Sequence, residues 1–154
     1  MIHPAPLQFG EAEPGVVYKD RPAAFGIAVS DGRLAAVRII RPEGASWIDL
    51  PGGALDPGEP EDRAMVREFG EETGLIVRPG AVVTRADQRF HKTDGEPVNN
   101  RSVILRAEIV GEDPALKIEE DHTLIWLEPE LAMRQLRHDS HAWGVLAWLR
   151  SGGA

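Results

Sequence analysis

The stretch from Gly53 to Leu75 constrains this chain most, because it places three glutamates on one face of a predicted helix. Glu68, Glu71 and Glu72 follow the i, i+3, i+4 spacing of an α-helix, so their like charges repel one another. Glu71 and Glu72 also precede Gly74, near the helix end where the macrodipole disfavours anions. A divalent cation would relieve this repulsion, and local preferences tend to be broken at functional sites. The segment therefore predicts a metal-dependent enzyme, with a solvated acidic helix face as the alternative.

The composition fits one globular domain that spans residues 1–154, with 42% hydrophobic and 27% charged residues. The chain has no cysteine, which excludes disulfides, zinc–thiolate sites and cysteine nucleophiles and is compatible with a reducing cytoplasm. No stretch has the length and apolar character of a membrane span, and the N-terminus lacks a basic region followed by an apolar run. We therefore expect a soluble, cytoplasmic protein with no membrane partner.

The charge of the chain is unevenly distributed. A net charge of −8 argues against a nucleic-acid partner that is held by neutralising many phosphates. The segment between Gly52 and Leu75 carries seven acidic and two basic residues, whereas the remainder of the chain is close to balanced. A metal bound among these acids would reverse the local sign of the charge. This arrangement is therefore compatible with a polyphosphate substrate.

The predicted elements alternate between strands and helices. Pro60 suits the first helical position and Gly74 the residue just beyond a helix, so the glutamates lie on a helix of about four turns. Ala23–Val29 and Leu34–Ile40 flank the turn Ser30–Gly32 and predict a hairpin. The other predictions are strands at Trp47–Leu50, Leu75–Val83, Ser102–Val110 and Thr123–Leu127, a polar loop at His91–Arg101, and helices at Pro129–Leu136 and His141–Leu149. This order predicts helices on both sides of a mixed sheet.

The acidic segment also follows a longer pattern, G-x5-E-x7-R-E-[apolar]-x-E-E-x-G-[apolar]. Every specified position is met, by Gly53, Glu59, Arg67, Glu68, Phe69, Glu71, Glu72, Gly74 and Leu75. The pattern resembles the Nudix box of MutT-like hydrolases, and the preceding WIDLPGG resembles the usual approach to that box. Phe69 is bulkier than the aliphatic residue of many members, which we expect to affect packing alone.

The resemblance implies an α/β fold, namely an α/β/α sandwich with a mixed central β-sheet. It also implies divalent-metal-dependent hydrolysis of a diphosphate linkage in a nucleoside diphosphate that is linked to another moiety. Mg²⁺ or Mn²⁺ is the expected cofactor, and carboxylate and water oxygens are the ligands that Mg²⁺ prefers. Homodimers are common among such sandwiches, so a homodimer is a possible state of this chain.

The resemblance assigns roles to the residues of the box. Glu68 and Glu72 are expected to bind a metal directly, and Glu71 a further metal or a coordinated water. Glu68 is also the expected general base. Arg67 is expected to orient the catalytic glutamate while Glu59 holds Arg67, although Arg67 also fits a simple i, i+4 partner of Glu71.

Two further metal ligands are predicted outside the helix. The main-chain carbonyl of Gly52 lies at a strand end, where no side chain obstructs the approach of an ion. Glu120 is predicted as an additional carboxylate because Nudix members often place one in the loop before the last strand. An ordinary acidic surface loop is the alternative for Glu119–Asp121.

The residues that bind the substrate are not determined by the sequence. Phe90 is a candidate for stacking on a base, whereas the tryptophans are expected in the core. Arg38, Arg89 and Lys92 are candidates for phosphate contacts, and the histidines at 91, 122, 138 and 141 show no pattern of a metal site. A non-catalytic nucleotide sensor on the same fold is the alternative function. A diphosphate isomerase is disfavoured because it would need a cysteine.

Overall fold

The structure is a computed structural model, and it describes residues 7–153. The larger of its two sheets runs in the order β1-β7-β8-β2-β6. Its strands are β1 (Leu7–Phe9), β2 (Lys19–Ile27), β6 (Gly52–Ala54), β7 (Leu75–His91) and β8 (Pro97–Glu112). β7 and β8 are antiparallel, whereas β2 and β8 are parallel. The predicted mixed sheet is therefore confirmed.

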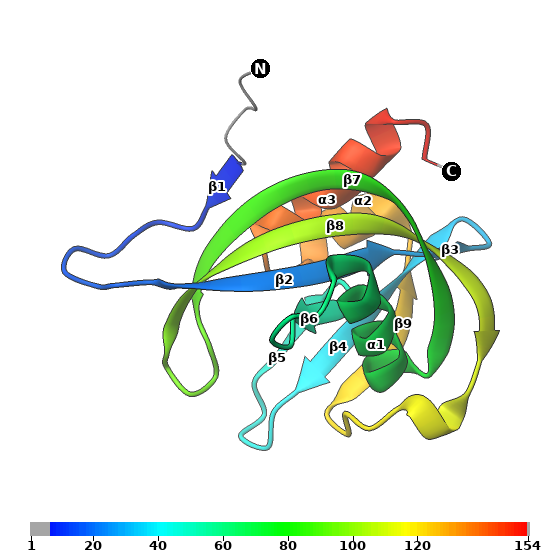
Figure 1. Cartoon of the computed structure of the whole chain (residues 1–154), viewed down its shortest axis with the longest axis horizontal. Helices are drawn as coiled ribbons and strands as arrows, with labels where there is room; N and C mark the ends of the chain where they lie inside the picture. Colours follow the sequence, from blue (N-terminus) through cyan, green and yellow to red (C-terminus); the bar gives the residue numbers. More distant parts are fainter. Residues whose placement is uncertain (1–6, 154) are drawn as a thin grey trace.

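The smaller sheet is built around β4 (Arg33–Ile40), which pairs with three neighbours. These neighbours are β3 (Val29–Ser30), β5 (Ser46–Asp49) and β9 (His122–Leu127), and all of them are antiparallel to β4. The start of β9 contacts the acidic helix α1 (Glu61–Thr73), and Figure 1 shows the two elements at the same end of the molecule. The chain therefore returns to the neighbourhood of the acidic helix at β9.

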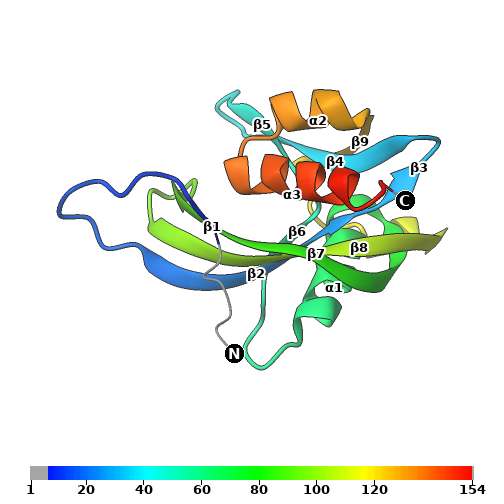
Figure 2. The same ribbon diagram turned by 90° about the horizontal axis from the view of Figure 1, so that it is seen from above.

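Helices cover both faces of the larger sheet. α1 (Glu61–Thr73) lies on one face, and α2 (Pro129–Gln135) and α3 (Asp139–Arg150) lie on the other, as Figure 2 shows. A short 3₁₀ turn, Pro114–Leu116, packs near the end of α1. This arrangement confirms the predicted α/β/α order. In residues 7–153, no helix combines the length and the apolar character that crossing a membrane would require.

Alternate residues of β2 face two different hydrophobic cores. Ala23, Phe25 and Ile27 belong to the core beneath α2 and α3, whereas Ala24, and Ala28 just after the strand, belong to the core beneath α1. This period of two is what a strand with both faces covered requires. β2 therefore lies inside the sheet, between β8 and β6.

The helix α1 approaches β2 at a glycine. A Cβ atom on Gly26 would lie 2.8 Å from Sδ of Met65 and 2.9 Å from Cε2 of Phe69. Both α1 side chains are fully buried. The bulk of Phe69 is thus accommodated by the missing side chain of Gly26, and the contact holds the face of the helix that carries the glutamates at a fixed distance from the sheet.

The predicted bounds of the acidic helix are confirmed to within one residue. α1 begins at Glu61, so Pro60 occupies the N-cap instead of the first helical position. The helix ends at Thr73, and Gly74 adopts φ 77°, in the left-handed region that glycine enters without strain. The Gly74 N–H donates to the carbonyl oxygen of Gly70 at 2.8 Å and closes the helix.

The predicted hairpin is wrong in its first strand. The turn forms as expected, with Asp31 at φ 51°, but only Val29 and Ser30 pair across it with β4. β2 instead pairs with β8 and β6 in the larger sheet. Both of its faces are apolar, and only in this sheet are both covered by helices. The chain therefore changes sheets at Ala28.

β7 and β8 are longer than predicted. The polar loop expected at His91–Arg101 is reduced to residues 92–96, and its remaining residues are paired in the sheet. Register shifts between Pro79 and Val82 and between Val82 and Thr84 interrupt the alternation of β7. The short strands β1 and β6, of three residues each, were not predicted.

Candidate active site

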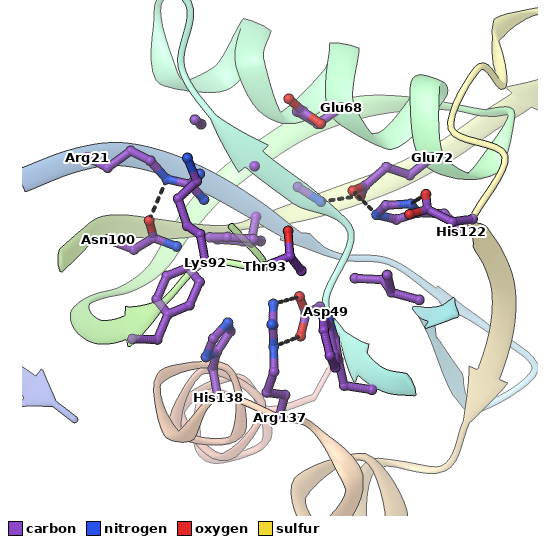
Figure 3. Close-up of a pocket in the computed structure, with 18 of the residues that line it drawn as sticks. Arg21, Asp49, Glu68, Glu72, Lys92, Thr93, Asn100, His122, Arg137 and His138 are labelled. Carbon is purple, nitrogen blue, oxygen red and sulfur yellow. Dashed lines mark hydrogen bonds and ion pairs between the residues drawn. The ribbon is translucent and has the colours of Figure 1, made fainter. Parts of the chain in front are cut away.

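A cavity of about 340 Å³ opens between α1, β2, β5, the β7–β8 turn, the start of β9 and the α2–α3 connection. Figure 3 shows that Glu68 and Glu72 enter the cavity from one side and that Arg137 and His138 enter it from the opposite side. We divide its principal lining residues into an acidic side (Gly52, Gly53, Glu68, Glu72 and His122), an aromatic side (Phe25, Trp47, Phe90, Asp49, Arg137 and His138) and a cationic side (Arg21, Lys92, Thr93 and Asn100).

Glu68 lies against the main chain of β6. A Cβ atom on Gly53 would be 2.9 Å from Cδ of Glu68, so the absent side chain leaves the space that this carboxylate occupies. Burial raises the pKa of Glu68, and the charges of Glu71 and Glu119 raise it further, against the lowering effect of Arg67. The structure therefore holds Glu68 where its negative charge is poorly compensated.

Replacing Gly53 by alanine tests this close approach. The new methyl group would displace the Glu68 carboxylate while leaving the exposed surface unchanged, so we expect activity to fall by about 10- to 100-fold with folding retained. Steady-state kinetics and circular dichroism on the purified variant provide the measurement. Alanine at Gly111 in β8, where a Cβ atom would meet only Cδ1 of Ile76 at an ordinary 3.7 Å, serves as the matched control. Full activity in Gly53→Ala would contradict the assigned position of Glu68.

Glu72 is the most deeply buried of the three glutamates, with a side chain that is 8% exposed. Its Oε1 accepts the Gly52 N–H at 2.9 Å, and its Oε2 lies 3.0 Å from Nε2 of His122. Burial raises the pKa of Glu72 to about 7. Gly52, whose carbonyl was predicted as a metal ligand, therefore lies directly beside the carboxylate of Glu72, which was also predicted as a ligand.

His122 connects Glu72 to a second group of charged side chains. Its Nδ1 lies 2.7 Å from Oδ1 of Asp121, whose Oδ2 accepts from Arg41 at 2.8 Å. Burial alone would lower the pKa of His122, but the hydrogen bonds to Glu72 and Asp121 raise it to about 9. No site role was predicted for this histidine from the sequence, and its position beside Glu72 was missed.

Glu119, Asp121 and His122 each offer a ligand atom, and these atoms lie within 4.8 Å of one another. Glu120 is exposed and belongs neither to this group nor to the lining of the cavity. The loop is fixed to α1 because the N–H groups of Ile118 and Glu119 both donate to the carbonyl oxygen of Glu71. An acidic residue of the loop before β9 does therefore lie near the helix, but it is Glu119 and not Glu120. The charge of Glu119 raises the pKa of Glu68.

Arg67 joins four carboxylates at the flank of the acidic side. Its Nε and Nη2 donate to the two oxygens of Glu59 at 2.8 Å each. Its Nη1 donates to Glu68 at 3.0 Å and to Glu71 at 3.2 Å, and Nε lies 3.5 Å from Asp56. The hydrogen bonds from Arg67 lower the pKa of Glu59 to about 2. These contacts bring together Glu59, Arg67 and Glu68, as expected if Arg67 orients the catalytic glutamate. Glu71 contacts Arg67 and does not line the cavity.

The aromatic side is organised by Arg137. Its guanidinium lies 4.6 Å from the ring centroid of Trp47 and 5.4 Å from that of Phe90. It also donates to both carboxylate oxygens of Asp49, which is 7% exposed. Phe90 was predicted as a stacking candidate and does line the cavity. Trp47 lines it too, although it was predicted in the core.

Two buried histidines carry no charge here: His138 belongs to the aromatic side, and His141 packs against it. Burial lowers the pKa of His138 to about 2 and that of His141 to about 4. The ring of His138 packs 4.6 Å from Phe90 and 5.0 Å from His141, measured between centroids. His141 accepts the Leu50 N–H through Nδ1 at 3.1 Å. Both rings are therefore neutral in the folded protein.

This burial predicts that the protein is destabilised by mild acid. An unfolded histidine binds a proton below pH 6.5, whereas the folded rings resist protonation until the pH approaches their lowered pKa values. The stabilisation is thus complete above pH 6.5 and is lost as the pH falls, by about 1.4 kcal/mol per pH unit for each ring. We expect thermal melts of His138→Leu to depend less steeply on pH than those of the wild type between about pH 4.5 and 6.5. Equal slopes would refute this expectation.

The acidic side fits a divalent cation by its donor set and its shape. Glu68 and Glu72 both line the cavity, their charged forms are disfavoured by burial, and Gly53 leaves room beside Glu68. A cation would stabilise both charged carboxylates, which is the reverse of the effect of burial. The chemistry of these residues therefore fits an oxygen-liganded ion such as Mg²⁺ or Mn²⁺.

Comparisons with known proteins agree with this geometry. A family model described as the NUDIX domain matches residues 20–149. A NUDIX hydrolase structure from Nitrosomonas europaea superposes with a TM-score of 0.72 at 19% identity, covering 86% of this chain and 90% of that one. A MutT protein structure from Methanosarcina mazei Go1 gives a TM-score of 0.68 at 17% identity, covering 91% of this chain and all of that one, 100%. These likenesses concern the fold.

Similar sequences match the chain over shorter stretches. A Mycobacterium tuberculosis protein that is provisionally named 8-oxo-dGTP diphosphatase 2 is 38% identical over 42% of this chain and 55% of its own length. An RNA pyrophosphohydrolase from Sphingopyxis alaskensis is 29% identical over 44% of this chain and 42% of its own length. The chain thus matches only about half of the length of these curated relatives.

Proposed function

Because this chain belongs to the Nudix family, we propose that it hydrolyses a diphosphate linkage in a nucleoside diphosphate that is joined to another moiety. The observation that carries the proposal is one cavity in which Glu68 and Glu72 face Arg21 and Lys92. Carboxylates suit a metal ion, and the cations suit the phosphates of the substrate. The names of the relatives support the reaction class, since both describe phosphate anhydride chemistry.

The proposed metal ligands are Glu68, Glu72 and the carbonyl of Gly52, with Glu71 beside them. The role predicted for Glu120 fits Glu119 better, because the charge of Glu119 acts on Glu68 while Glu120 is exposed. Mg²⁺ or Mn²⁺ bound there would polarise the reacting phosphoryl group and make a water molecule more acidic. These assignments follow from the donor types and their placement.

The side chains around the ion have separate tasks. Glu68 accepts the proton of the attacking water, and Arg67 holds Glu68 in position through its 3.0 Å hydrogen bond. Glu59 fixes Arg67 by two bonds of 2.8 Å, so the guanidinium cannot rotate away. Phe90 and Trp47 offer aromatic surfaces for a base. Catalysis in this scheme rests on positioning and electrostatics.

A substrate panel tests the proposal. Nucleoside triphosphates, including 8-oxo-dGTP, would be assayed beside ADP-ribose and a dinucleoside polyphosphate, with Mg²⁺ or with a chelator. Products would be identified by chromatography. We expect at least one compound to be cleaved at a diphosphate linkage with kcat/KM of about 10⁴ M⁻¹s⁻¹ or more, in the presence of the ion alone. If every compound is inert while a nucleotide still binds, the sensor alternative replaces the proposal.

A further inference from the structure

Arg21 on β2 is a half-buried cation with an incomplete set of partners. Its Nε donates to Oδ1 of Asn100 at 2.8 Å, and its guanidinium lies 5.8 Å from the ring centroid of Phe90. Among residues 7–153, no carboxylate lies within ion-pair distance of it. Its two terminal nitrogens therefore face the cavity without an anionic partner.

The other arginines of the cavity are differently placed. Arg41 is paired with Asp121 at 2.8 Å, and Arg137 binds Asp49 through two hydrogen bonds. Burial lowers the pKa of Arg21, and although Glu68 attracts its charge, Arg137 repels it. A charge in such surroundings is costly unless a counterion arrives. Glu68 and Glu96 thus attract the charge of Arg21 from a distance, but among residues 7–153 no carboxylate contacts it.

Lys92 adds a second cation to the same side of the cavity. Its main-chain N–H donates to the carbonyl oxygen of Glu96 at 2.9 Å, which fixes the β7–β8 turn from which the side chain projects. Its Nζ lies 3.6 Å from Asp94 and 3.7 Å from Glu96, which are longer than hydrogen bonds. These loose contacts leave the ammonium donors available to a ligand.

The position of these two cations matters because they face the acidic side. Figure 3 shows Arg21, Asn100 and Lys92 together on one side of the cavity, with Glu68 and Glu72 on another. A substrate whose reacting phosphorus lies at Glu68 would extend its phosphate chain into the space between. The next phosphate along that chain would then meet Arg21 and Lys92.

We propose that Arg21 and Lys92 form a phosphate subsite that selects substrates with a further phosphate group beyond the diphosphate linkage. Asn100 holds Arg21 in place through Nε, so its terminal nitrogens can donate to phosphate oxygens. A triphosphate chain fills the subsite, whereas a diphosphate that ends in a neutral sugar leaves Arg21 without an anionic partner and Lys92 with only its two long contacts to Asp94 and Glu96. This inference rests on the proposed function for the direction of the chain.

Binding of inorganic tripolyphosphate tests the subsite without turnover. Isothermal titration calorimetry in chelator-treated buffer would compare the wild type with Arg21→Gln and Lys92→Gln. We expect each variant to bind the probe about tenfold more weakly or worse, because a charge-assisted hydrogen bond is lost. Arg78→Gln is the matched control, since Arg78 is exposed on β7 and lies outside this cavity. Wild type that does not bind, or variants that bind like the wild type, would overturn the proposal.

Selectivity provides the second readout. The ratio of kcat/KM for ATP to that for ADP-ribose should fall about tenfold or more in Arg21→Gln and stay constant in Arg78→Gln. An unchanged ratio in Arg21→Gln overturns the subsite even if the enzyme is active. If no substrate is cleaved at all, the proposed hydrolysis fails, while the calorimetric comparison still decides the phosphate subsite. Lys92→Gln lies in a surface turn and guards against a folding defect in Arg21→Gln.

Discussion

Replacing Glu68 by glutamine should lower kcat by about 10³-fold or more, the largest effect that we expect from one atom-sized change. The amide keeps the size of the side chain but removes both a metal ligand and the proposed general base. It also cannot hold the same charge-assisted bond with Arg67, which now measures 3.0 Å. Steady-state kinetics with the best substrate of the panel would measure the loss, and product analysis would exclude a contaminating enzyme.

The stability of Glu68→Gln separates this catalytic effect from misfolding. Burial and the charges of Glu71 and Glu119 disfavour ionised Glu68, so a neutral amide should leave the melting temperature of the metal-free protein unchanged or higher. The rise in melting temperature caused by Mg²⁺ should shrink, because ligand binding stabilises the folded state. Glu61→Gln is the control on the same helix, since Glu61 pairs with Arg85 away from the cavity. Wild-type turnover in Glu68→Gln would remove Glu68 from the mechanism.

Replacing Arg67 by alanine should impair both activity and stability. The change leaves Glu59, Glu68 and Glu71 without their shared cation, although the arginine side chain is 28% exposed and water can partly replace it. We expect the free energy of unfolding to fall by about 2–3 kcal/mol, which is below the range for a fully buried pair. We also expect kcat/KM to fall by about 10²-fold, because the glutamates lose their fixed orientation. Urea denaturation and kinetics measure the two effects.

A double-mutant cycle with Glu59 decides what Arg67 does. If Arg67 orients the catalytic glutamate through Glu59, then Glu59→Gln, Arg67→Ala and the double variant should lose similar activity, so that the effects are far from additive. If Arg67 is only an i, i+4 partner of Glu71, the stability cost would be about 0.2–0.5 kcal/mol and activity would hardly change. Arg134→Ala, on the exposed face of α2, supplies the baseline for losing an arginine. A loss in Arg67→Ala no larger than this baseline would contradict the orienting role.

The acidic helix could be predicted closely because its signals are local. Pro60, Gly74 and the apolar positions at Met65 and Phe69 are all read within one segment, and α1 follows them. The pairing of β2 could not be predicted from adjacent residues, because its partners β8 and β6 come later in the chain. The turn at Asp31 formed as expected while the strand before it joined another sheet. Local chemistry determines turns and helix ends, whereas strand partners depend on which distant surfaces need covering.

In the candidate site too, residues within one local segment could be predicted, whereas residues with distant partners could not. The box residues were identified through the resemblance to the Nudix box, and the structure places Arg67 in direct contact with both Glu59 and Glu68. Arg137 was not identified, because its partner Asp49 is 88 positions away. Arg21 was not identified either, since its lack of a carboxylate partner exists only in the folded chain. Of the three cations predicted to reach phosphates, Lys92 lines the cavity, whereas Arg38 is exposed and Arg89 donates to the Gly10 carbonyl.

Electron paramagnetic resonance of Mn²⁺ tests the metal requirement most directly. Free Mn²⁺ gives a strong signal that disappears as the ion binds, so the bound fraction can be counted in solution. We predict that the wild type removes this signal, more strongly with a nucleotide present, and that Glu68→Gln combined with Glu72→Gln restores it. A full free-ion signal with the wild-type protein and nucleotide together would contradict the idea that these buried carboxylates hold the catalytic cation.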